Sequence, residues 1–215
     1  MKIAIIQGTT QVDKNELPFN VTRKFTAPYH HQILNFGVDE NEEESYSYTE
    51  VAILIALLIN SQVVDFVITG CSSGQGMNLA CNTLPGLLSG YIPTPQDAFL
   101  FGRINGGNVA SLPLGLGFGW LGELNLEYTL EKLFDGEFGI GFPKDVAERK
   151  VKEINRIKEF NRISKYGMIE VMERLDAETQ RKVFSKVNVI DYIIHSSKDK
   201  PLVSYLVDKR TKFNL

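Results

Sequence analysis

A buried strand followed at once by a loop of glycine and serine constrains this chain more than any other feature. Val63–Ile68 form an apolar run, and residues 69–76 continue it as Thr-Gly-Cys-Ser-Ser-Gly-Gln-Gly. The small and apolar residues after the loop predict a helix. A strand without polar alternation is typical of a parallel sheet that is covered on both faces. The loop therefore joins a strand to a helix at the carboxyl edge of a predicted parallel sheet.

The residues of this loop suit it to hold a polarised or negatively charged oxygen. Backbone N–H groups and the positive end of the helix dipole face whatever lies above that edge of the sheet. Gly74 and Gly76 let the backbone approach a ligand because they carry no Cβ. Cys71 supplies a thiol at a helix N-terminus, where the thiolate is favoured, and Ser72 and Ser73 supply hydroxyls. We interpret the loop as the floor of an active site.

The first 135 residues alternate predicted strands with predicted helices. Strands are expected at residues 2–6, 33–38, 63–68, 87–92 and 109–112, and helices at 12–26, 48–61, 93–102 and 121–135, besides the helix after the loop. Connections of helical length between strands favour a parallel sheet with helices on both faces. The expected fold is α/β: a three-layer α/β/α sandwich around a five-stranded, Rossmann-like parallel sheet.

The character of the chain changes after Pro143. Long charged helical patterns predict helices at residues 144–164, 168–174, 177–186 and 189–194, followed by a strand at 202–207. We assign residues 1–154 to the α/β domain and residues 155–215 to a mostly helical C-terminal extension. A segment of this size is small for an independent fold. We therefore expect it to pack on the core or on a partner subunit.

Composition excludes several classes of protein. The net charge is −3 without a basic stripe, so no nucleic acid partner is expected. The apolar run Val51–Ile59 is too short to span a membrane, and the N-terminus shows no signal-peptide pattern, so no membrane partner is expected. The sequence has two cysteines, and both lie around the same loop and helix, so we expect no disulfide framework and a cytoplasmic location. No cluster has metal-ligand spacing, and we expect neither a metal nor another cofactor.

Three groups of residues form a pattern that extends beyond the loop. They are Gly74-x-Gly76-Met77-x-x-Ala80-x-Asn82, Pro85-Gly86 and Asn105-x-x-Asn108-Val109, with a helix at Glu123–Phe134. This pattern resembles the family of type B ribose-5-phosphate isomerases and galactose-6-phosphate isomerases, over roughly residues 1–154. The resemblance implies interconversion of aldose and ketose phosphates through an enediol or enediolate. It also implies a homodimer, or a dimer of dimers, whose subunits share their active sites.

The resemblance implies a role for individual residues. Cys71 stands where many members carry the cysteine that removes the substrate proton. Ser73 matches a hydroxyl residue that bonds the reacting oxygens, and Asn105 matches an asparagine that helps to hold the enediolate. The further residues that we expect to bind substrate are Gln7, Thr9, Ser72, Gly74, Gln75 and Gly76, with Arg103, Lys144 and Arg149 as candidates to hold a phosphate group.

The sequence departs from the family pattern at two sites, and the arginines with which members hold phosphate near their last helix have no clean match. Gly8 and Thr9 stand where members usually carry an Asp-His pair, and Ile104 replaces the histidine that opens the sugar ring in many members. Two hypotheses from different classes therefore stand, besides a third that keeps the isomerisation but changes the sugar, for instance to one that is already open-chain. The first is a sugar-phosphate aldose–ketose isomerase, with Cys71 as the base and a pentose or hexose phosphate as substrate. The alternative is a non-catalytic or regulatory sugar-phosphate-binding protein on the same scaffold.

Single residues of the predicted site also have simpler interpretations. A free cysteine is most often a small buried hydrophobic residue, which is our interpretation of Cys81. Ser73 would serve equally as a helix cap, and Asn105 as part of the turn with Gly106 and Gly107. For Cys71 we favour the functional interpretation because hydroxyls and glycines adjoin it in the same loop.

Overall fold

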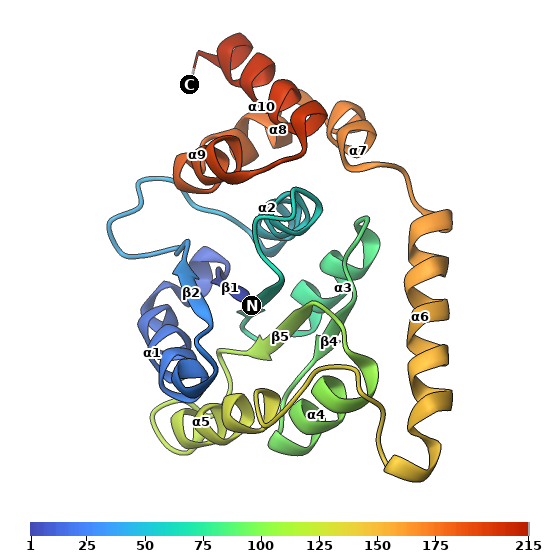
Figure 1. Ribbon diagram of the computed structural model, residues 1–215. Coiled ribbons are helices and arrows are strands. Elements are labelled where there is room, and N and C mark those ends of the chain that lie inside the picture. The colour runs from blue at the N-terminus through green and yellow to red at the C-terminus, as the bar shows by residue number, and fades with distance from the viewer. Residues whose placement is uncertain (215) are drawn as a thin grey trace.

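The computed structural model describes residues 1–214, and its centre is one parallel sheet (Figure 1). The strands are β1 (Lys2–Ile5), β2 (Gln32–Asn35), β3 (Phe66–Cys71), β4 (Ser89–Tyr91) and β5 (Val109–Pro113). They lie in the order β2-β1-β3-β5-β4, and each neighbouring pair is parallel. The prediction of a five-stranded parallel sheet is confirmed.

Helices cover both faces of this sheet. On one face α2 (Tyr48–Asn60) and α3 (Gln75–Thr83) pack against strand residues such as Val67. On the other face Ile68 and its neighbours pack against α1 (Glu16–Thr26), α4 (Pro95–Leu100) and α5 (Gly122–Leu133). Successive strand residues point to opposite faces, so an apolar strand needs cover on both. The predicted three-layer α/β/α sandwich is confirmed.

Several short turns connect these elements. They are the 3-10 turns η1 (Thr9–Lys14), η2 (Ala27–Tyr29) and η4 (Lys144–Val146) and the π-helical turn η3 (Phe101–Asn105). Two of them bear on function because they border the sheet at opposite edges. The turn η1 follows β1 at the carboxyl edge, whereas η3 precedes β5 at the amino edge.

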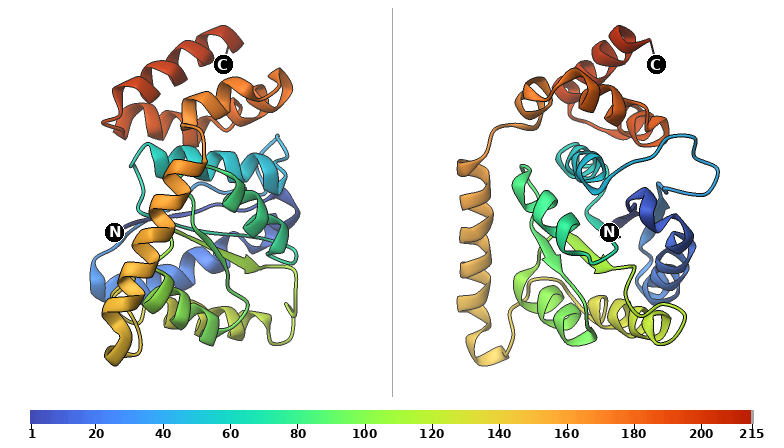
Figure 2. Two further views of the ribbon diagram at one scale, coloured as in Figure 1. Left: turned by 90° about the vertical axis from the view of Figure 1, so that its right-hand side faces the viewer. Right: turned by 180° about the vertical axis from the view of Figure 1, so that it is seen from behind.

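Every regular element of the C-terminal part, over its described length, is a helix. The long helix α6 (Ala147–Ser164) runs along the outside of the α/β core, and the predicted domain boundary after residue 154 falls within it. Four more helices follow and lie over α2, as Figure 2 shows: α7 (Met168–Arg174), α8 (Ala177–Phe184), α9 (Val187–Ser196) and α10 (Lys200–Phe213).

The predicted strand at residues 202–207 is wrong, because these residues lie in α10. Leu202 and Leu206 are both buried one helical turn apart, a spacing that the apolar pattern also satisfies. The Asp199 side chain accepts a hydrogen bond from the backbone N–H of Leu202, and Pro201 occupies the first turn. Both are helix-start signals, and they outweigh the β-propensity of the segment.

The apolar helix α2 explains how the extension is attached. Its residues 51–58 are all buried, although a helix on the surface of a sheet needs only one apolar face. The second face of α2 packs against Phe184 and Ile190 and their neighbours in the extension, within one hydrophobic cluster. Within residues 1–214 there is no helix with the length and apolarity that crossing a membrane requires.

Candidate active site

The loops after β1 and β3 meet at the carboxyl edge of the sheet. The strand order reverses between these two neighbours, since β2 lies beyond β1 while β5 and β4 lie beyond β3. Open parallel sheets bind ligands at such a switch point. The side-chain amide of Gln11, in η1, donates a hydrogen bond of 2.9 Å to the hydroxyl of Ser72. The two loops therefore form one continuous wall.

Gln11 is a residue of this wall that the sequence analysis missed. It is buried, and its amide also donates to the carbonyl oxygen of Thr10. The signal that identifies it is its place in the loop after β1, four residues beyond the predicted Gln7. Through this hydrogen bond Gln11 fixes the orientation of the Ser72 hydroxyl.

Cys71 is the last residue of β3 and is partly exposed. Its carbonyl oxygen accepts hydrogen bonds from the N–H of Gly74 at 3.2 Å and from the N–H of Leu114 at 3.0 Å, and these bonds fix the turn that follows. Cys81, on α3, is fully buried, and this burial raises the pKa of its thiol to about 12. Cys81 is a core residue, as predicted, and Cys71 borders the loop.

Gly74 has a conformation and a location that require glycine. Its φ is +76°, and a Cβ there would lie 2.8 Å from the carbonyl carbon of Leu112 and 2.9 Å from the Tyr91 ring. The hydroxyl of Ser111 donates to its carbonyl oxygen over 2.6 Å. This residue immediately precedes α3, so the first turn of that helix directs its N–H groups and the positive end of its dipole toward the loop.

The remaining predicted residues of the loop lie at its surface. Ser72, Ser73 and Gln75 are exposed, and Gly76 is half-buried beside the Tyr48 ring. The backbone N–H of Gln75 donates to the Ser73 hydroxyl at 3.3 Å. Ser73 therefore takes part in the helix start and still offers its hydroxyl hydrogen to a ligand, so that both interpretations of this residue fit the geometry.

Gln7 and Thr9 lie in the same wall but are already engaged with the protein. The Gln7 amide donates to the carbonyl oxygen of Val38 over 2.8 Å and accepts from Asn15 over 2.9 Å. The hydroxyl oxygen of Thr9 accepts a hydrogen bond of 2.6 Å from the backbone N–H of Tyr46, and its own hydrogen remains available. Thr9 can therefore contact a ligand, whereas the bonds of Gln7 fix the loop.

Arg103 and Asn105 lie at the opposite edge of the sheet. Both belong to η3, which leads into the amino end of β5, whereas Cys71 pairs with Pro113 at the carboxyl end of that strand. The length of β5 alone separates them by about 13 Å, at the usual rise of a strand. One chain therefore does not bring Arg103 or Asn105 to Cys71.

The predicted phosphate-binding cations are not grouped around one open site in this chain. Arg103 is buried, where it donates to the carbonyl oxygens of Leu133, at 3.0 Å, and of Asp135. Burial lowers the pKa of Arg103, and the Asp135 charge opposes that change. Lys144 and Arg149 are exposed near the start of α6, and Arg149 pairs with Glu153 at 3.5 Å.

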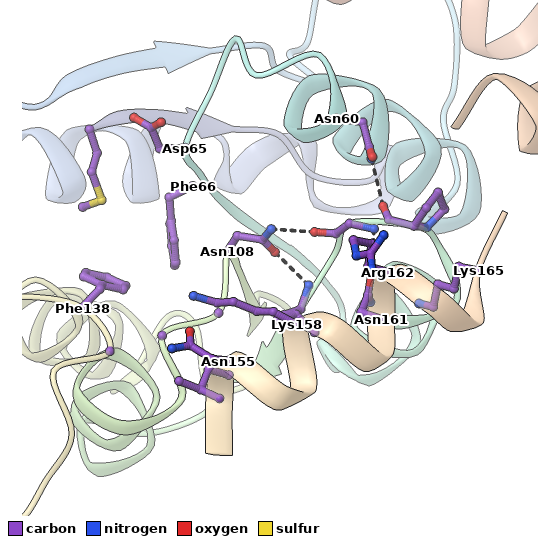
Figure 3. Close-up of a pocket in the computed structure, with 18 of the residues that line it drawn as sticks. Asn60, Asp65, Phe66, Asn108, Phe138, Asn155, Lys158, Asn161, Arg162 and Lys165 are labelled. Atoms are coloured by element: carbon purple, nitrogen blue, oxygen red, sulfur yellow. Dashed lines mark hydrogen bonds between the residues drawn. The ribbon is translucent and has the colours of Figure 1, made fainter. Parts of the chain in front are cut away.

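The amino edge also holds a cavity of about 620 Å³ between α6 and the core (Figure 3). Its asparagines and one lysine hold the backbone of residues 84–88: Asn161 donates to Leu87, Asn108 to Gly86, and Lys165 to Leu84, at 2.7–2.9 Å. The Asn108 and Pro85-Gly86 parts of the sequence pattern thus have a structural role, since they fix the connection between α3 and β4.

The carboxyl edge offers little positive charge. Of the described residues in the loops that border Cys71, Lys14 is the one Lys or Arg, and it pairs with Asp13 and lies 5.3 Å from the centre of the Phe118 ring. Within residues 1–214 no three His, Cys, Asp or Glu side chains are grouped so that they could hold a metal ion. The polar groups described at this edge are one thiol, hydroxyls, backbone and side-chain amides and the ammonium group of Lys14.

Comparison with known proteins adds to this geometry. A family model described as Ribose/Galactose Isomerase matches residues 3–138. The chain is similar to a solved 4-deoxy-L-threo-5-hexosulose-uronate ketol-isomerase, with 34% identity over 100% of both chains and a TM-score of 0.91. It is also similar to the ribose-5-phosphate isomerase LacAB_rpiB from Vibrio parahaemolyticus, with 32% identity over 97% of this chain and 98% of that chain and a TM-score of 0.89.

More distant structures share the fold over a shorter length. The type B ribose 5-phosphate isomerase from Trypanosoma cruzi is 18% identical, with a TM-score of 0.61, and the match covers 75% of this chain and 98% of that one. About a quarter of this chain thus has no counterpart in that enzyme. No curated protein sequence matches the chain.

Proposed function

Because this chain belongs to the ribose/galactose isomerase family, and is thereby an aldose–ketose isomerase, we propose that Cys71 is its catalytic base. The predicted resemblance to this family is confirmed. The observation that carries the role of Cys71 is its place at the switch point of the sheet, next to Ser72 and Ser73 and to the first turn of α3. The residue is partly exposed and also packs against the core that α2 and α3 cover.

The proposed reaction moves one proton between neighbouring carbons. The Cys71 thiolate takes the proton from the carbon next to the carbonyl group, and the C–H electron pair forms the double bond of an enediolate. The thiol then returns the proton to the former carbonyl carbon, while a hydroxyl proton passes between the two oxygens. Ser73 and the loop amides stabilise the negative oxygen, as preorganised donors in an oxyanion hole do.

We propose that the active unit is a homodimer in which Asn105 of a second copy completes the site. Asn105 is exposed at the amino edge, where it cannot reach the thiol of its own chain. In support, α6 beside that edge exposes apolar side chains that a monomer would leave in water: Ile157, Phe160 and Ile163 are 45%, 50% and 64% exposed. Lys144 and Arg149 are the cations that a second copy would bring.

Two substrate classes are candidates. A pentose or hexose phosphate fits the family, but a phosphate dianion needs charge-assisted donors, and Lys14 is the single cation in the loops around Cys71. The second candidate is an unphosphorylated acidic sugar such as the hexosulose-uronate named for the relative that matches 100% of this chain. An open-chain substrate of this kind also needs no ring-opening histidine at Ile104.

The experiment supplies the purified enzyme with ribose 5-phosphate and with 4-deoxy-L-threo-5-hexosulose-uronate in separate heavy-water reactions. We expect turnover of at least one, with deuterium incorporated at the carbon that receives the proton, and loss of both signals in Cys71→Ala. Saturable binding of either sugar without exchange would instead support the non-catalytic alternative.

A further inference from the structure

The C-terminal extension holds the segment that covers the carboxyl edge beside β2. Residues 36–46 follow β2 and contact α8, α9 and the two residues between these helices. Lys186 forms an ion pair with Glu42, Lys182 with Glu44, and the Tyr46 hydroxyl lies 3.1 Å from that of Ser185. These contacts link positions that are 138 to 144 residues apart in the sequence.

The contact between Lys186 and Glu42 differs from the other ion pairs of the described chain in its burial. The Lys186 side chain is 2% exposed and that of Glu42 is 19% exposed. Burial lowers the pKa of Lys186, and its hydrogen bond with Glu42 opposes the change. Removal of one partner of a buried pair leaves the other charge without compensation, so the position of residues 36–46 depends strongly on Lys186.

Residues 36–46 in turn hold the loop after β1. The carbonyl oxygen of Gly37 accepts from the backbone N–H of Gln7 over 3.1 Å. Thr9 and Tyr46 exchange two bonds: the Thr9 N–H donates to the Tyr46 carbonyl oxygen over 2.9 Å, and the Tyr46 N–H donates to the Thr9 hydroxyl oxygen over 2.6 Å. The same loop reaches Ser72 through Gln11.

We infer that Lys186 is a positioning residue of the active site: through Glu42 and residues 36–46 it fixes the loop of Thr9 and Gln11 against the Cys71 loop. The inference rests on the proposed function at that site. The extension would then contribute to catalysis by positioning this loop. The match to the Trypanosoma cruzi enzyme leaves about a quarter of this chain without a counterpart.

The test compares Lys186→Met with Lys186→Arg and with a matched control, Arg210→Met. The control removes an ion pair between Arg210 and Asp191, which both lie inside the extension. We expect Lys186→Met to raise KM at least tenfold with kcat within threefold of wild type, because Thr9 and Ser72 position the substrate and Cys71 remains. Lys186→Arg should recover most of the loss, and Arg210→Met should leave both constants unchanged.

Hydrogen exchange at residues 7–11 provides a readout that does not depend on turnover. The Thr9 amide is protected by the Tyr46 carbonyl oxygen, so Lys186→Met should speed its exchange at least tenfold while Arg210→Met does not. A folded Lys186→Met protein with wild-type KM and wild-type exchange would overturn the inference. If wild type shows no turnover, the proposed function fails, and the exchange comparison alone decides whether Lys186 positions the loop.

A second variant covers the case in which Lys186→Met does not fold. Glu42→Gln removes the negative charge that pairs with Lys186 and keeps the side-chain length and an oxygen that can accept a hydrogen bond from Lys186. We expect a roughly threefold rise in KM and faster exchange at Thr9. Unchanged KM together with unchanged exchange in this variant would also overturn the inference.

Discussion

In the function that we propose, the two edges of the sheet carry complementary parts of an isomerase site. The carboxyl edge holds Cys71, its neighbouring hydroxyls and the start of α3, with Lys14 as the cation of its described loops. The amino edge holds the exposed Asn105 and a cavity bordered by α6, but neither of the cysteines. A parallel sheet separates its two edges by the length of its strands, so the proposed site requires that the two parts meet between two chains. Because the two edges hold different residues, substitutions can test the role of each edge separately.

Substitution of the two cysteines is expected to produce the largest difference. Cys71→Ala should lower kcat by at least about a thousandfold, since it removes the proposed general base. Cys81→Ala is the matched control: it should keep kcat and cost about 1 kcal/mol of stability through a small loss of packing in the core. Turnover and thermal unfolding of both variants check this, and wild-type turnover in Cys71→Ala would remove the thiol from the mechanism.

The rate of alkylation distinguishes the same two thiols without mutation. The pKa of Cys81 is raised to about 12, so its protonated form persists far above neutral pH. At pH 8 only about one molecule in ten thousand carries the Cys81 thiolate, which is the reactive form. Iodoacetamide should therefore modify Cys71 at least about a hundredfold faster than Cys81, as peptide mass spectrometry would show. Equal rates at the two positions would contradict the environments described above.

Subunit mixing tests whether the two edges meet between chains. Cys71→Ala and Asn105→Ala homodimers should each be nearly inactive. In a heterodimer of the two variants, one of the two sites combines an intact Cys71 with an intact Asn105. A random mixture contains half heterodimers, so activity should return to about a quarter of wild type, given a two-fold symmetric dimer. A mixture that is no more active than its components would place both residues of a site in one chain.

The sequence allowed the sheet and the position of Cys71 to be predicted because both depend on local signals. The run Val63–Ile68 has no polar alternation, and Gly74 marks a turn that only a residue without Cβ can make. Such patterns act over a few residues and do not depend on distant contacts. The predicted element order and the core location of Cys81 follow from the same kind of signal.

The sequence did not allow contacts across the fold to be predicted. Lys186 and Glu42 stand 144 positions apart within ordinary charged segments, and no local pattern pairs them. Arg103 is buried because it binds the carbonyl oxygen of Leu133 at the end of α5. The residues next to Arg103 in the sequence do not indicate where that helix ends. The apolar pattern at residues 202–207 fits both a strand and a helix, and the decision came from Asp199 and Pro201 just before it.

Trp120 offers a smaller but direct test of which edge binds the sugar. It is the single tryptophan of the sequence and is 86% exposed. Its loop lies against the Cys71 loop, since the N–H groups of Leu114 and Gly115 donate to the carbonyl oxygens of Cys71 and Ser72 at 3.0 and 2.9 Å. A sugar bound at the carboxyl edge would change the solvent around this indole, whereas a sugar bound only at the amino edge would not.

The expected result is a modest, saturable change in tryptophan emission as substrate is added. Cys71→Ala should show the same change, because the variant loses the base and keeps the binding surface, while Trp120→Phe should show none. The midpoint of the change in Cys71→Ala would then give the affinity of the carboxyl edge without turnover. Full catalysis in wild type with constant emission would mean that substrate binds away from this loop. That result would contradict the proposal that the sugar binds at the carboxyl edge.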